Sequence, residues 1–320
     1  MNSEQCLNDI YKILTDTLAD SGCWEDALTE LKYSTKRNGS HDILFDFVNF
    51  SEIIPIQRER GLLNLKVLFE DSEAYWAIVS PEGFMLSKNV DKYVSNLFTI
   101  NGRLNLNTDI YNFKYESGKL SVERNSPTIL LPKISKISYI VEPAFKLPLS
   151  KWPFSSSLVP ARVRNKFPWY FAIPWRNPKN NDDRTFSACA PDWENELLEQ
   201  QPKSLKILHL MNRLRRLHLK SLPKLTSYML VTVVLHQLSV INWQRDWVSL
   251  LSEIWTRLSG NLRAGRIDSF LIDGLNLLDC MTSKELEQCV DTTRKILFQI
   301  LEARYNNTRE DAEKLFDVDL

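Results

Sequence analysis

The sequence predicts an α+β lobe followed by an all-helical lobe. Within the first 145 residues, short segments rich in β-branched and aromatic side chains are joined by short turns, a pattern typical of strands. From Glu194 onward, apolar residues recur at helical spacing. We place the boundary so that residues 1–185 form the α+β lobe, an N-terminal helix plus a sheet. Residues 186–320 then form the helical lobe.

Two helices are predicted in the first lobe. The first ends at Gly22, where glycine permits the left-handed turn that closes a helix, and Ser3 is a suitable N-cap. Its apolar residues recur every three or four positions: Leu7, Ile10, Leu14 and Leu18. The second is expected to begin with Ser87 as its cap and to run through Leu97.

Strands are predicted where β-branched and aromatic residues cluster. The segments are residues 42–50, 65–69, 75–79, 119–123, 128–131 and 137–145. Seven prolines then fall between Pro143 and Pro178, with Trp152, Trp169 and Trp175 among them. Proline fixes φ and lacks an amide donor, so this stretch is expected to hold neither regular helix nor central strand. We interpret it as an ordered connector packed by its aromatic residues; the alternative is a proline-rich ligand for another protein.

The second lobe is predicted to consist of several helices. Its basic first part carries an apolar stripe with spacings of three, at Leu205, Leu208, Met211, Leu214 and Leu217. Residues 228–238 are apolar nearly all round, which indicates a buried helix. Helices are also expected at residues 247–262 and 283–303, with a loop at Asp273-Gly274. The tail from Asn306 is acidic and polar, and we expect it to fray.

Composition excludes several classes of protein. The net charge is zero and the pI is about 6.9, so any binding to nucleic acid must come from a local patch. The five cysteines include no Cys-x-x-Cys pair, which favours reduced thiols in an intracellular protein. The most apolar run is residues 228–238, too short for the ~20 residues of a membrane span. No basic region precedes an apolar core at the N-terminus. We therefore expect a cytoplasmic or nuclear protein that does not associate with membranes.

Several segments together resemble the Mab-21 family, which includes cyclic GMP-AMP synthase and its insect relatives. They occur in the family's order, at residues 83–87, 139–145, 152–153, 193–198, 205–215, 227–228 and 270–278. The resemblance covers nearly the whole chain. It implies a nucleotidyltransferase-like mixed-sheet lobe joined to a helical Mab-21 C-terminal lobe, with the active cleft between them.

The metal site of the family does not carry over residue by residue. The family's chemistry uses two divalent cations held by three carboxylates, two at i and i+2 on one strand and one on a neighbouring strand. Alignment leaves Asp42 as a remnant of the first pair, with Ser40 at the other position. The third acid is replaced by Ile140, and the phosphate-holding Gly-Ser turn falls at Asp26-Ala27. The resemblance therefore implies a degenerate site, with no metal or other cofactor expected.

A shifted triad of Asp42, Asp46 and Glu142 is the alternative, and with it Mg²⁺ or Mn²⁺ as cofactor. Asp42 and Asp46 share strand parity, and Glu142 shares parity with Ile140 on the neighbouring strand. However, carboxylates four residues apart on a strand lie about 13 Å from each other. Paired catalytic metals are only about 4 Å apart, so the strand would have to bend. The other interpretation of Asp46 and Glu142 is that they are solvated or ion-paired surface acids.

The elements that bind nucleotides in the family are better preserved. By resemblance, Tyr228 would stack on a base, Ser227 would contact a base edge and Lys206 would reach a phosphate. The alternative for Tyr228 is a core residue with a tethered hydroxyl. The position of the family's next lysine holds Val231. Arg213 and Arg216 share a helical face that Lys220 is expected to continue, and this stripe would contact double-stranded RNA or simply face solvent.

Three functions remain open at this point. The first is a non-catalytic protein that binds a nucleotide ligand or a protein partner whose identity the sequence does not reveal. The second is a receptor that senses double-stranded RNA and synthesises a cyclic dinucleotide in innate immunity, as a Mg²⁺-dependent nucleotidyltransferase. The third is a developmental protein-interaction module, as in other Mab-21 proteins.

Overall fold

The computed structural model describes residues 30–37, 40–46, 53–58, 61–68, 78–92, 111–116, 119–124, 136–154, 158–175 and 182–306. The chain divides into two compact units. The first consists of Met1–Pro153, Pro168–Arg176 and Asp182–Cys189, and the second of Phe154–Phe167, Asn177–Asn181 and Ala190–Leu320. The chain thus passes between the two units more than once before residue 190. The sequence-based boundary after residue 185 stays a prediction.

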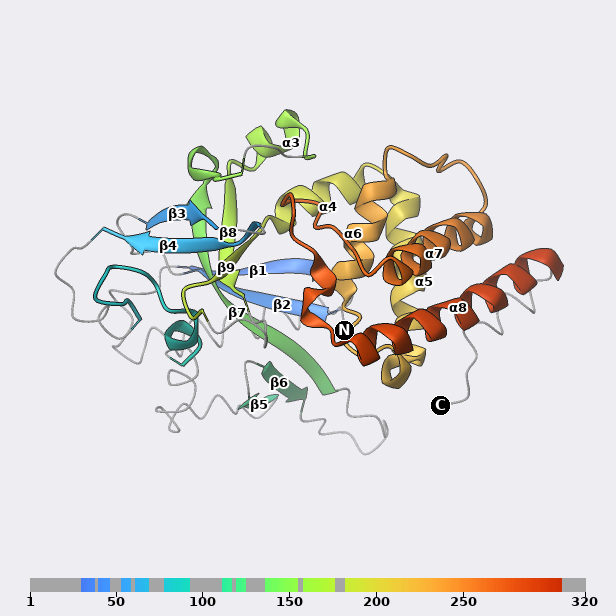
Figure 1. The fold of residues 1–320 in the computed structure, drawn as a ribbon, viewed down its shortest axis with the longest axis horizontal. Coiled ribbons are helices and arrows are strands. Elements are labelled where there is room, and N and C mark those ends of the chain that lie inside the picture. The colour runs from blue at the N-terminus through green and yellow to red at the C-terminus, as the bar shows by residue number, and fades with distance from the viewer. Residues whose placement is uncertain are drawn as a thin grey trace. The chain divides into compact units, whose positions relative to one another are not determined.

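A mixed β-sheet forms the first unit (Figure 1). Its main path has the order β1-β2-β7-β8-β9-β4-β3, and β6 pairs with both β5 and β7. Among the described strands, β2 and β7 pair in parallel and the other pairs are antiparallel. The strands are β1 (Glu30–Arg37), β2 (Ser40–Asp46), β3 (Ile53–Gln57), β4 (Leu63–Val67), β5 (Tyr111–Glu116), β6 (Lys119–Arg124), β7 (Lys136–Pro148), β8 (Trp169–Pro174) and β9 (Phe186–Cys189). Together with the helices below, this confirms the α+β fold class.

The strand predictions agree with the structure at β2, β4, β6 and β7, within a few residues at their ends. The sequence missed β1, β3, β5, β8 and β9. Of the predicted strand at 75–79, Val79 makes only an isolated bridge with Met85, and Tyr75 to Ala77 lie outside the described residues. The predicted helix before Gly22, the strand at 128–131 and the tail after Asn306 also lie outside them.

Residues 87–92 are helical, and the rest of the helix predicted to reach Leu97 is outside the described part of the chain. Ser87 lies inside this helix. Its hydroxyl donates to the Asp183 carbonyl at 2.7 Å. The prediction of Ser87 as the cap is therefore wrong, and Ser87 instead anchors the helix start to another segment of the unit.

The expectation that the proline-rich stretch holds neither regular helix nor central strand is wrong, because it contains the short helix α3 (Ala161–Lys166) and the strand β8. β8 lies between β7 and β9 in the sheet. Pro148 and Pro174 stand at strand ends. Pro143 falls between the part of β7 that pairs with β6, up to Ile140, and the part that pairs with β8, from Phe145. These prolines avoid interior positions of the antiparallel ladders, although Pro143 pairs with Phe45 inside the parallel ladder of β2 and β7.

Aromatic residues pack this part of the first unit, as expected. The rings of Trp152 and Tyr170 meet edge to face with centroids 4.9 Å apart, and the Tyr170 hydroxyl donates to the Lys151 carbonyl at 2.8 Å. Phe145 and Phe186 form a second such pair at 5.8 Å, and both are completely buried. These contacts centre the core of the unit on β7, β8 and β9.

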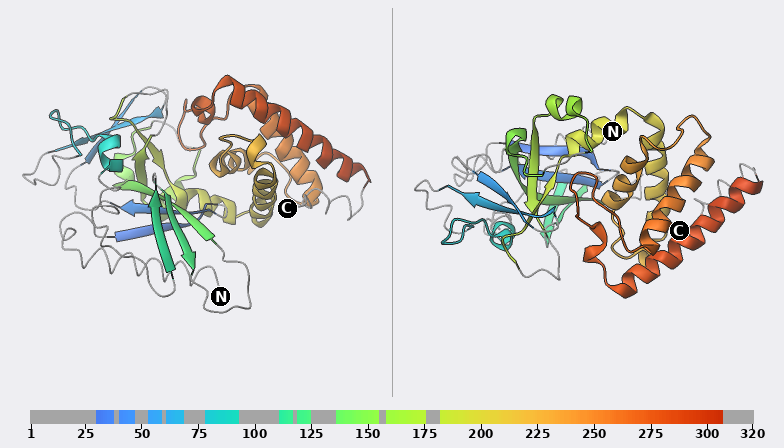
Figure 2. Two further views of the ribbon diagram at one scale, coloured as in Figure 1. Left: turned by 90° about the horizontal axis from the view of Figure 1, so that it is seen from below. Right: turned by 45° about the horizontal axis from the view of Figure 1, so that its top comes forward.

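Helices form nearly all of the second unit (Figures 1 and 2). They are α3 (Ala161–Lys166), α4 (Pro191–Glu199), α5 (Pro202–Leu217), α6 (Ser227–Gln237), α7 (Trp247–Arg263) and α8 (Ser283–Asn306), with short 3₁₀ turns η4 (Leu219–Ser221) and η5 (Leu277–Cys280). A further 3₁₀ turn, η3 (Leu149–Lys151), belongs to the first unit. The helical predictions from Glu194 onward are confirmed.

The buried face of α5 differs from the predicted stripe. Ile207, Leu208, Met211 and Leu214 are buried, whereas Leu205 is 41% exposed. Steps of three residues fall short of a helical turn of 3.6 residues, so a stripe built only from threes drifts around the helix. The true face combines spacings of three and four, and Leu205 lies outside it.

The core of the second unit surrounds α6, as predicted. Every residue from Met229 to Leu235 is buried. The helix begins with Thr226, whose side chain accepts a hydrogen bond from the Met229 amide. α7 and α8 lie side by side, and Trp255 is completely buried with its indole N–H donating to the Thr293 carbonyl at 2.9 Å. The scaffold of this unit is therefore an apolar core in which the Trp255 N–H is satisfied, whereas the buried hydroxyls of Thr232 and Ser269 have no hydrogen-bond partner among the described residues.

Candidate functional site

The parallel pair β2 and β7 brings together the positions where the family places its carboxylates. Asp42 pairs directly with Ile140, Leu44 with Glu142 and Asp46 with Ala144. These are backbone registers, because the side chains of β2 and of β7 up to Glu142 lie outside the described ones. Ala144 is completely buried. The strand pair thus has the expected layout, with an apolar residue next to the remnant Asp42.

A two-metal centre does not fit this register. Neighbouring strands are about 4.8 Å apart, so the position opposite Asp42 is where a third carboxylate would share a cation with it. That position is Ile140, whose side chain offers no oxygen ligand. In the shifted triad, Glu142 pairs with Leu44, halfway between Asp42 and Asp46 along the strand. Each acid is then separated from the next by two residues, about 6.6 Å, along the strand direction.

Among the described side chains, no group of three His, Cys, Asp or Glu residues is close enough to hold a metal ion. The search does not reach the side chains of Asp42, Asp46 and Glu142, nor Asp26-Ala27. Cys189, Cys280 and Cys289 form no disulfide. Burial, with a smaller contribution from Glu285, raises the pKa of the Cys289 thiol to about 11, which disfavours the reactive thiolate.

Tyr228 is held by a buried carboxylate. Its hydroxyl donates to Oε1 of Glu194 at 3.0 Å. Glu194 lies on α4 and is only 2% exposed, whereas Tyr228 is half-buried at the start of α6. The bond therefore ties α4 to α6 within the second unit. Of the two interpretations of Tyr228, this geometry favours a tethered structural hydroxyl, with only part of the ring reaching solvent.

The Ser227 hydroxyl is also used inside the fold. It donates to Oδ1 of Asn212 at 2.8 Å and accepts from Nη2 of Arg215 at 3.2 Å. Asn212 is buried and its amide donates to the Leu208 carbonyl at 3.1 Å. The other terminal nitrogen of Arg215 donates to the Leu225 carbonyl at 3.1 Å. This network fixes the start of α6 on α5, so Ser227 would have to give up a structural bond to donate to a base.

Arg215 is a structural residue that sequence reasoning placed in the basic run without a separate role. It is half-buried, and desolvation, followed by repulsion from Arg216, lowers the pKa of its guanidinium. The group stays charged at neutral pH because an arginine pKa begins far above 7. Its position on α5 is the signal that could have revealed this role. Arg215 lies on the side of the last turns of α5 that faces the segment leading into α6, and it donates to that segment.

Lys206 is exposed on α5. Its ammonium group lies 6.0 Å from the centroid of the Trp247 ring. At this distance a cation interacts only weakly with an exposed ring. Of the three predicted nucleotide-binding residues, Lys206 is therefore the one whose polar group is least committed to the fold.

The basic stripe is shorter than predicted. Arg213 and Arg216 are exposed on one face of α5, but the helix ends at Leu217. Lys220 lies in the 3₁₀ turn η4, so the expectation that it continues the helical face is wrong. Lys224 has a left-handed backbone, with φ of 57°, and pairs with Glu285 at 3.2 Å. Whether Arg213, Arg216 and Lys220 contact nucleic acid stays a prediction.

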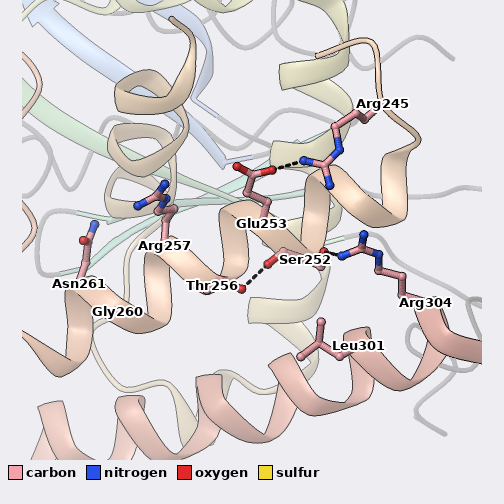
Figure 3. Close-up of a pocket in the computed structure, with 9 residues that line it drawn as sticks. All are labelled: Arg245, Ser252, Glu253, Thr256, Arg257, Gly260, Asn261, Leu301 and Arg304. Atoms are coloured by element: carbon pink, nitrogen blue, oxygen red, sulfur yellow. Dashed lines mark hydrogen bonds and ion pairs between the residues drawn. The ribbon is translucent and has the colours of Figure 1, made fainter. Parts of the chain in front are cut away.

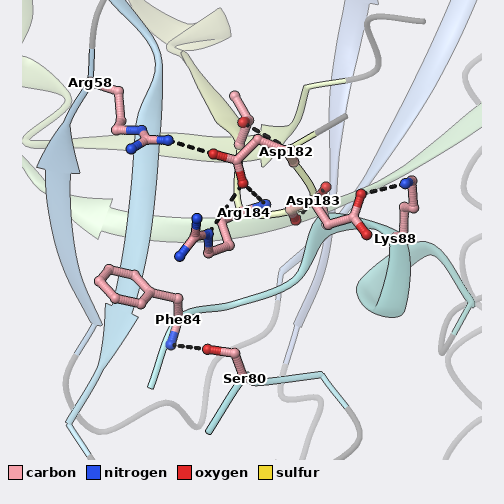
Figure 4. Close-up of polar contacts among 9 residues, drawn as sticks. Arg58, Ser80, Phe84, Lys88, Asp182, Asp183 and Arg184 are labelled. Atoms are coloured by element: carbon pink, nitrogen blue, oxygen red, sulfur yellow. Dashed lines mark hydrogen bonds and ion pairs between the residues drawn. The ribbon is translucent and has the colours of Figure 1, made fainter. Parts of the chain in front are cut away.

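A polar cluster around Asp182 was not anticipated (Figure 4). The Asp182 carboxylate binds the guanidinium groups of Arg58 and Arg184 and the Arg184 amide. Burial acts to raise its pKa, but these hydrogen bonds outweigh burial and lower it. Lys88 pairs with the neighbouring Asp183. The Asp-Asp-Arg run at 182–184 was the available sequence signal, and the cluster fixes the approach to β9 within the first unit.

An α+β unit with a mixed sheet, followed in sequence by helices, defines a nucleotidyltransferase-like protein. Residues 201–295 match the family model described as the Mab-21 protein HhH/H2TH-like domain. The chain is 41% identical over 162 residues to a cyclic GMP-AMP synthase-like protein of Drosophila melanogaster, a match covering 50% of this chain and 46% of the relative. It is 30% identical over 193 residues to a cyclic GMP-AMP synthase-like receptor of Drosophila eugracilis, covering 57% and 50%.

These matches agree with the resemblance to the Mab-21 family seen in the sequence: residues 201–295 match its C-terminal domain, and the chain is similar to cyclic GMP-AMP synthase-like proteins. Its matches span about half the length of these curated relatives. Among the described residues, no helix combines the length and apolarity needed to cross a bilayer.

Proposed function

We propose that this protein acts by binding and does not transfer nucleotidyl groups. One observation carries the proposal: on the neighbouring parallel strand, the residue in register with Asp42 is Ile140. An isoleucine cannot ligate a cation, and Mg²⁺ requires oxygen ligands in a tight octahedron. With Ser40 at the remaining position, the aligned residues supply a single carboxylate where two-metal chemistry needs three.

The proposed ligand is a nucleotide or a protein partner. Lys206 and the accessible part of the Tyr228 ring support a nucleotide. The structural bonds of the Ser227 and Tyr228 hydroxyls argue for weak nucleotide binding, because a ligand would have to replace them. Binding to a protein partner needs neither hydroxyl, and it also fits the third hypothesis, a developmental interaction module.

The second candidate is an active receptor that senses double-stranded RNA and makes a cyclic dinucleotide. Similarity to a cyclic GMP-AMP synthase-like receptor supports it, as do the exposed Arg213 and Arg216 on α5. It would require Mg²⁺ or Mn²⁺ bound by the shifted set of Asp42, Asp46 and Glu142. The separation of these residues along β2 and β7 is the argument against it.

The decisive experiment incubates the full chain with labelled ATP and GTP, with Mg²⁺ or Mn²⁺, and with or without duplex RNA. We expect product at the background level under every condition, and the same result for Asp42→Ala. Product above background that disappears in Asp42→Ala would overturn the proposal in favour of the receptor. Thermal unfolding with millimolar nucleotide then separates the two kinds of ligand, since a bound nucleotide raises the midpoint and a partner-binding module shows no shift.

A further inference from the structure

A groove of about 530 Å³ runs along α7 in the second unit, and its lining includes none of the residues that the family resemblance singles out (Figure 3). α7 lines it over more than two turns, from Ser252 to Asn261. Arg245, from the segment before α7, lies toward one end with Arg304 of α8, and Arg257 lies toward the other end. The groove is therefore built by elements of a single unit.

The groove is positively charged. Its described lining includes three arginines, Arg245, Arg257 and Arg304, and one acid, Glu253. Arg245 forms an ion pair with Glu253, which balances those two charges. Arg304 donates only to the neutral Ser252 hydroxyl, at 3.4 Å, and Arg257 is exposed with no hydrogen bond or ion pair among the described residues. Two guanidinium groups thus remain uncompensated, which favours an anionic ligand.

Gly260 leaves room for a ligand to approach α7 closely. It lies within the helix, which continues to Arg263, and it lines the groove. A Cβ atom at Gly260 would meet nothing within 4 Å, so the described fold does not require a glycine there. Glycine is nevertheless one of the least favourable residues in a helix. Its presence is explained if a ligand occupies the space that a side chain would fill.

An exposed apolar ridge on α8 borders the groove. It consists of Phe298, Leu301 and Tyr305, whose exposed fractions are 59%, 39% and 90%. Their spacings of three and four residues place them on one side of α8, and Leu301 lines the groove beside Arg304. Large apolar side chains gathered next to charged ones are typical of a protein-binding surface.

We propose that this groove binds an acidic peptide segment of a partner protein. Carboxylates of the segment would pair with Arg257 and Arg304, its apolar side chains would pack on the ridge of α8, and its backbone would pass over Gly260. A nucleic acid fits less well, because the Glu253 carboxylate lies in the groove and the ridge offers nothing to a sugar–phosphate chain. The inference is independent of whether the chain transfers nucleotides.

The test measures binding of the full chain to a fluorescent peptide of about twelve residues, rich in Glu and Asp and containing Leu and Phe, by anisotropy at low salt. We expect Arg257→Glu and Arg304→Glu each to weaken binding at least tenfold, since each reverses a charge that faces the peptide. Arg263→Glu is the matched control, because Arg263 is exposed on the same helix but does not line the groove; its binding should stay within twofold of the parent.

Gly260→Ala gives a result that misfolding cannot imitate. Alanine should raise the thermal midpoint by about 2 °C, because it favours the helix, while its methyl group weakens peptide binding at least fivefold. An acidic peptide without Leu and Phe should bind more weakly than the probe.

Four outcomes would overturn the proposal. These are no peptide binding at millimolar concentration, binding unchanged by Arg257→Glu, and preference for duplex RNA or inorganic phosphate over the peptide. The fourth is tight peptide binding only after the chain is shortened at Asn306, which would show that residues 307–320 of the same molecule fill the groove.

Discussion

The β2–β7 strand pair of the first unit and the α5–α6 junction of the second have diverged from the family pattern in opposite ways. In the strand pair, the backbone register is kept, but Ile140 stands beside Asp42. At the junction, the polar residues Ser227 and Tyr228 are kept, but their hydroxyls bind Asn212 and Glu194. Backbone pairing and burial hold a fold together whether or not its carboxylates survive. Conversely, a retained polar residue is not evidence of retained chemistry, because a structural hydrogen bond can account for it.

The largest effect is expected at Val231, where the family has a lysine. Val231 is 3% exposed in the middle of the buried part of α6. Restoring the family residue with Val231→Lys would bury a charge without a partner and lower the free energy of unfolding by about 3–5 kcal/mol. Urea unfolding followed by circular dichroism measures this.

The matched control is Leu219→Lys, at a position 56% exposed, which should change stability by no more than about 0.5 kcal/mol. If Val231→Lys keeps the parent's stability and gains nucleotide affinity, the junction is a ligand site and the comparison between the two regions fails.

Tyr228→Phe tests directly whether the kept hydroxyl is structural. Removing it leaves the buried Glu194 carboxylate without this donor, so the variant should lose about 1–3 kcal/mol of stability. The change in thermal midpoint on adding nucleotide should be the same as in the parent. A variant with unchanged stability and a lost nucleotide shift would instead place Tyr228 in a binding site.

Asp246 tests a structural polar group of the helical unit through the pH dependence of stability. Its side chain caps α7 by accepting from the Ser249 amide at 2.8 Å, and the hydrogen bonds from Ser249 hold the pKa of its carboxyl below the ordinary value. Asp246→Ala should lose about 1 kcal/mol at pH 7.

A carboxyl whose pKa is lower in the folded than in the unfolded protein contributes its full stabilisation above its unfolded pKa of about 3.9. That contribution to stability is lost as the pH falls through the folded-state pKa. Below about pH 3 the parent should therefore approach Asp246→Asn in urea unfolding, and its advantage over Asp246→Ala should shrink. Asp246→Asn keeps an acceptor without the charge, so its loss should be smaller and independent of pH. A difference between parent and Asp246→Ala that does not shrink in acid would contradict the charged cap.

The hydrophobic pattern within a single segment was sufficient to predict the helices that bury their apolar residues. α6 is apolar all round and α7 is strongly amphipathic, so both could be placed from sequence. β8 could not, because the prolines around it suggested a connector, and only the strand registers show that Pro148 and Pro174 stand at strand ends. Local propensity was outweighed there by tertiary pairing.

The candidate site was only partly predictable, for a related reason. The place of Ile140 beside Asp42 followed from the family resemblance, and the β2–β7 register agrees with it. The bonds of Ser227 and Tyr228 join residues 15 and 34 positions apart in the chain. No periodicity encodes such contacts, so the choice between a structural and a ligand-binding hydroxyl required coordinates.

The smallest expected effect is a difference in RNA retention between the residues of the predicted RNA-binding stripe. Arg213 and Arg216 lie three residues apart on the exposed face of α5, whereas Lys220 lies in η4 beyond the end of that helix. In a filter assay with duplex RNA, charge reversal at both arginines should abolish any retention by the chain, and Lys220→Glu should weaken it by less than about threefold. Each lost phosphate contact should also reduce the salt dependence of binding by about one charge, which distinguishes a contact from a distant field effect. If Lys220→Glu were as damaging as the double reversal, RNA would follow the turn rather than the helix. The bound surface would then extend past α5, as the sequence pattern alone suggested.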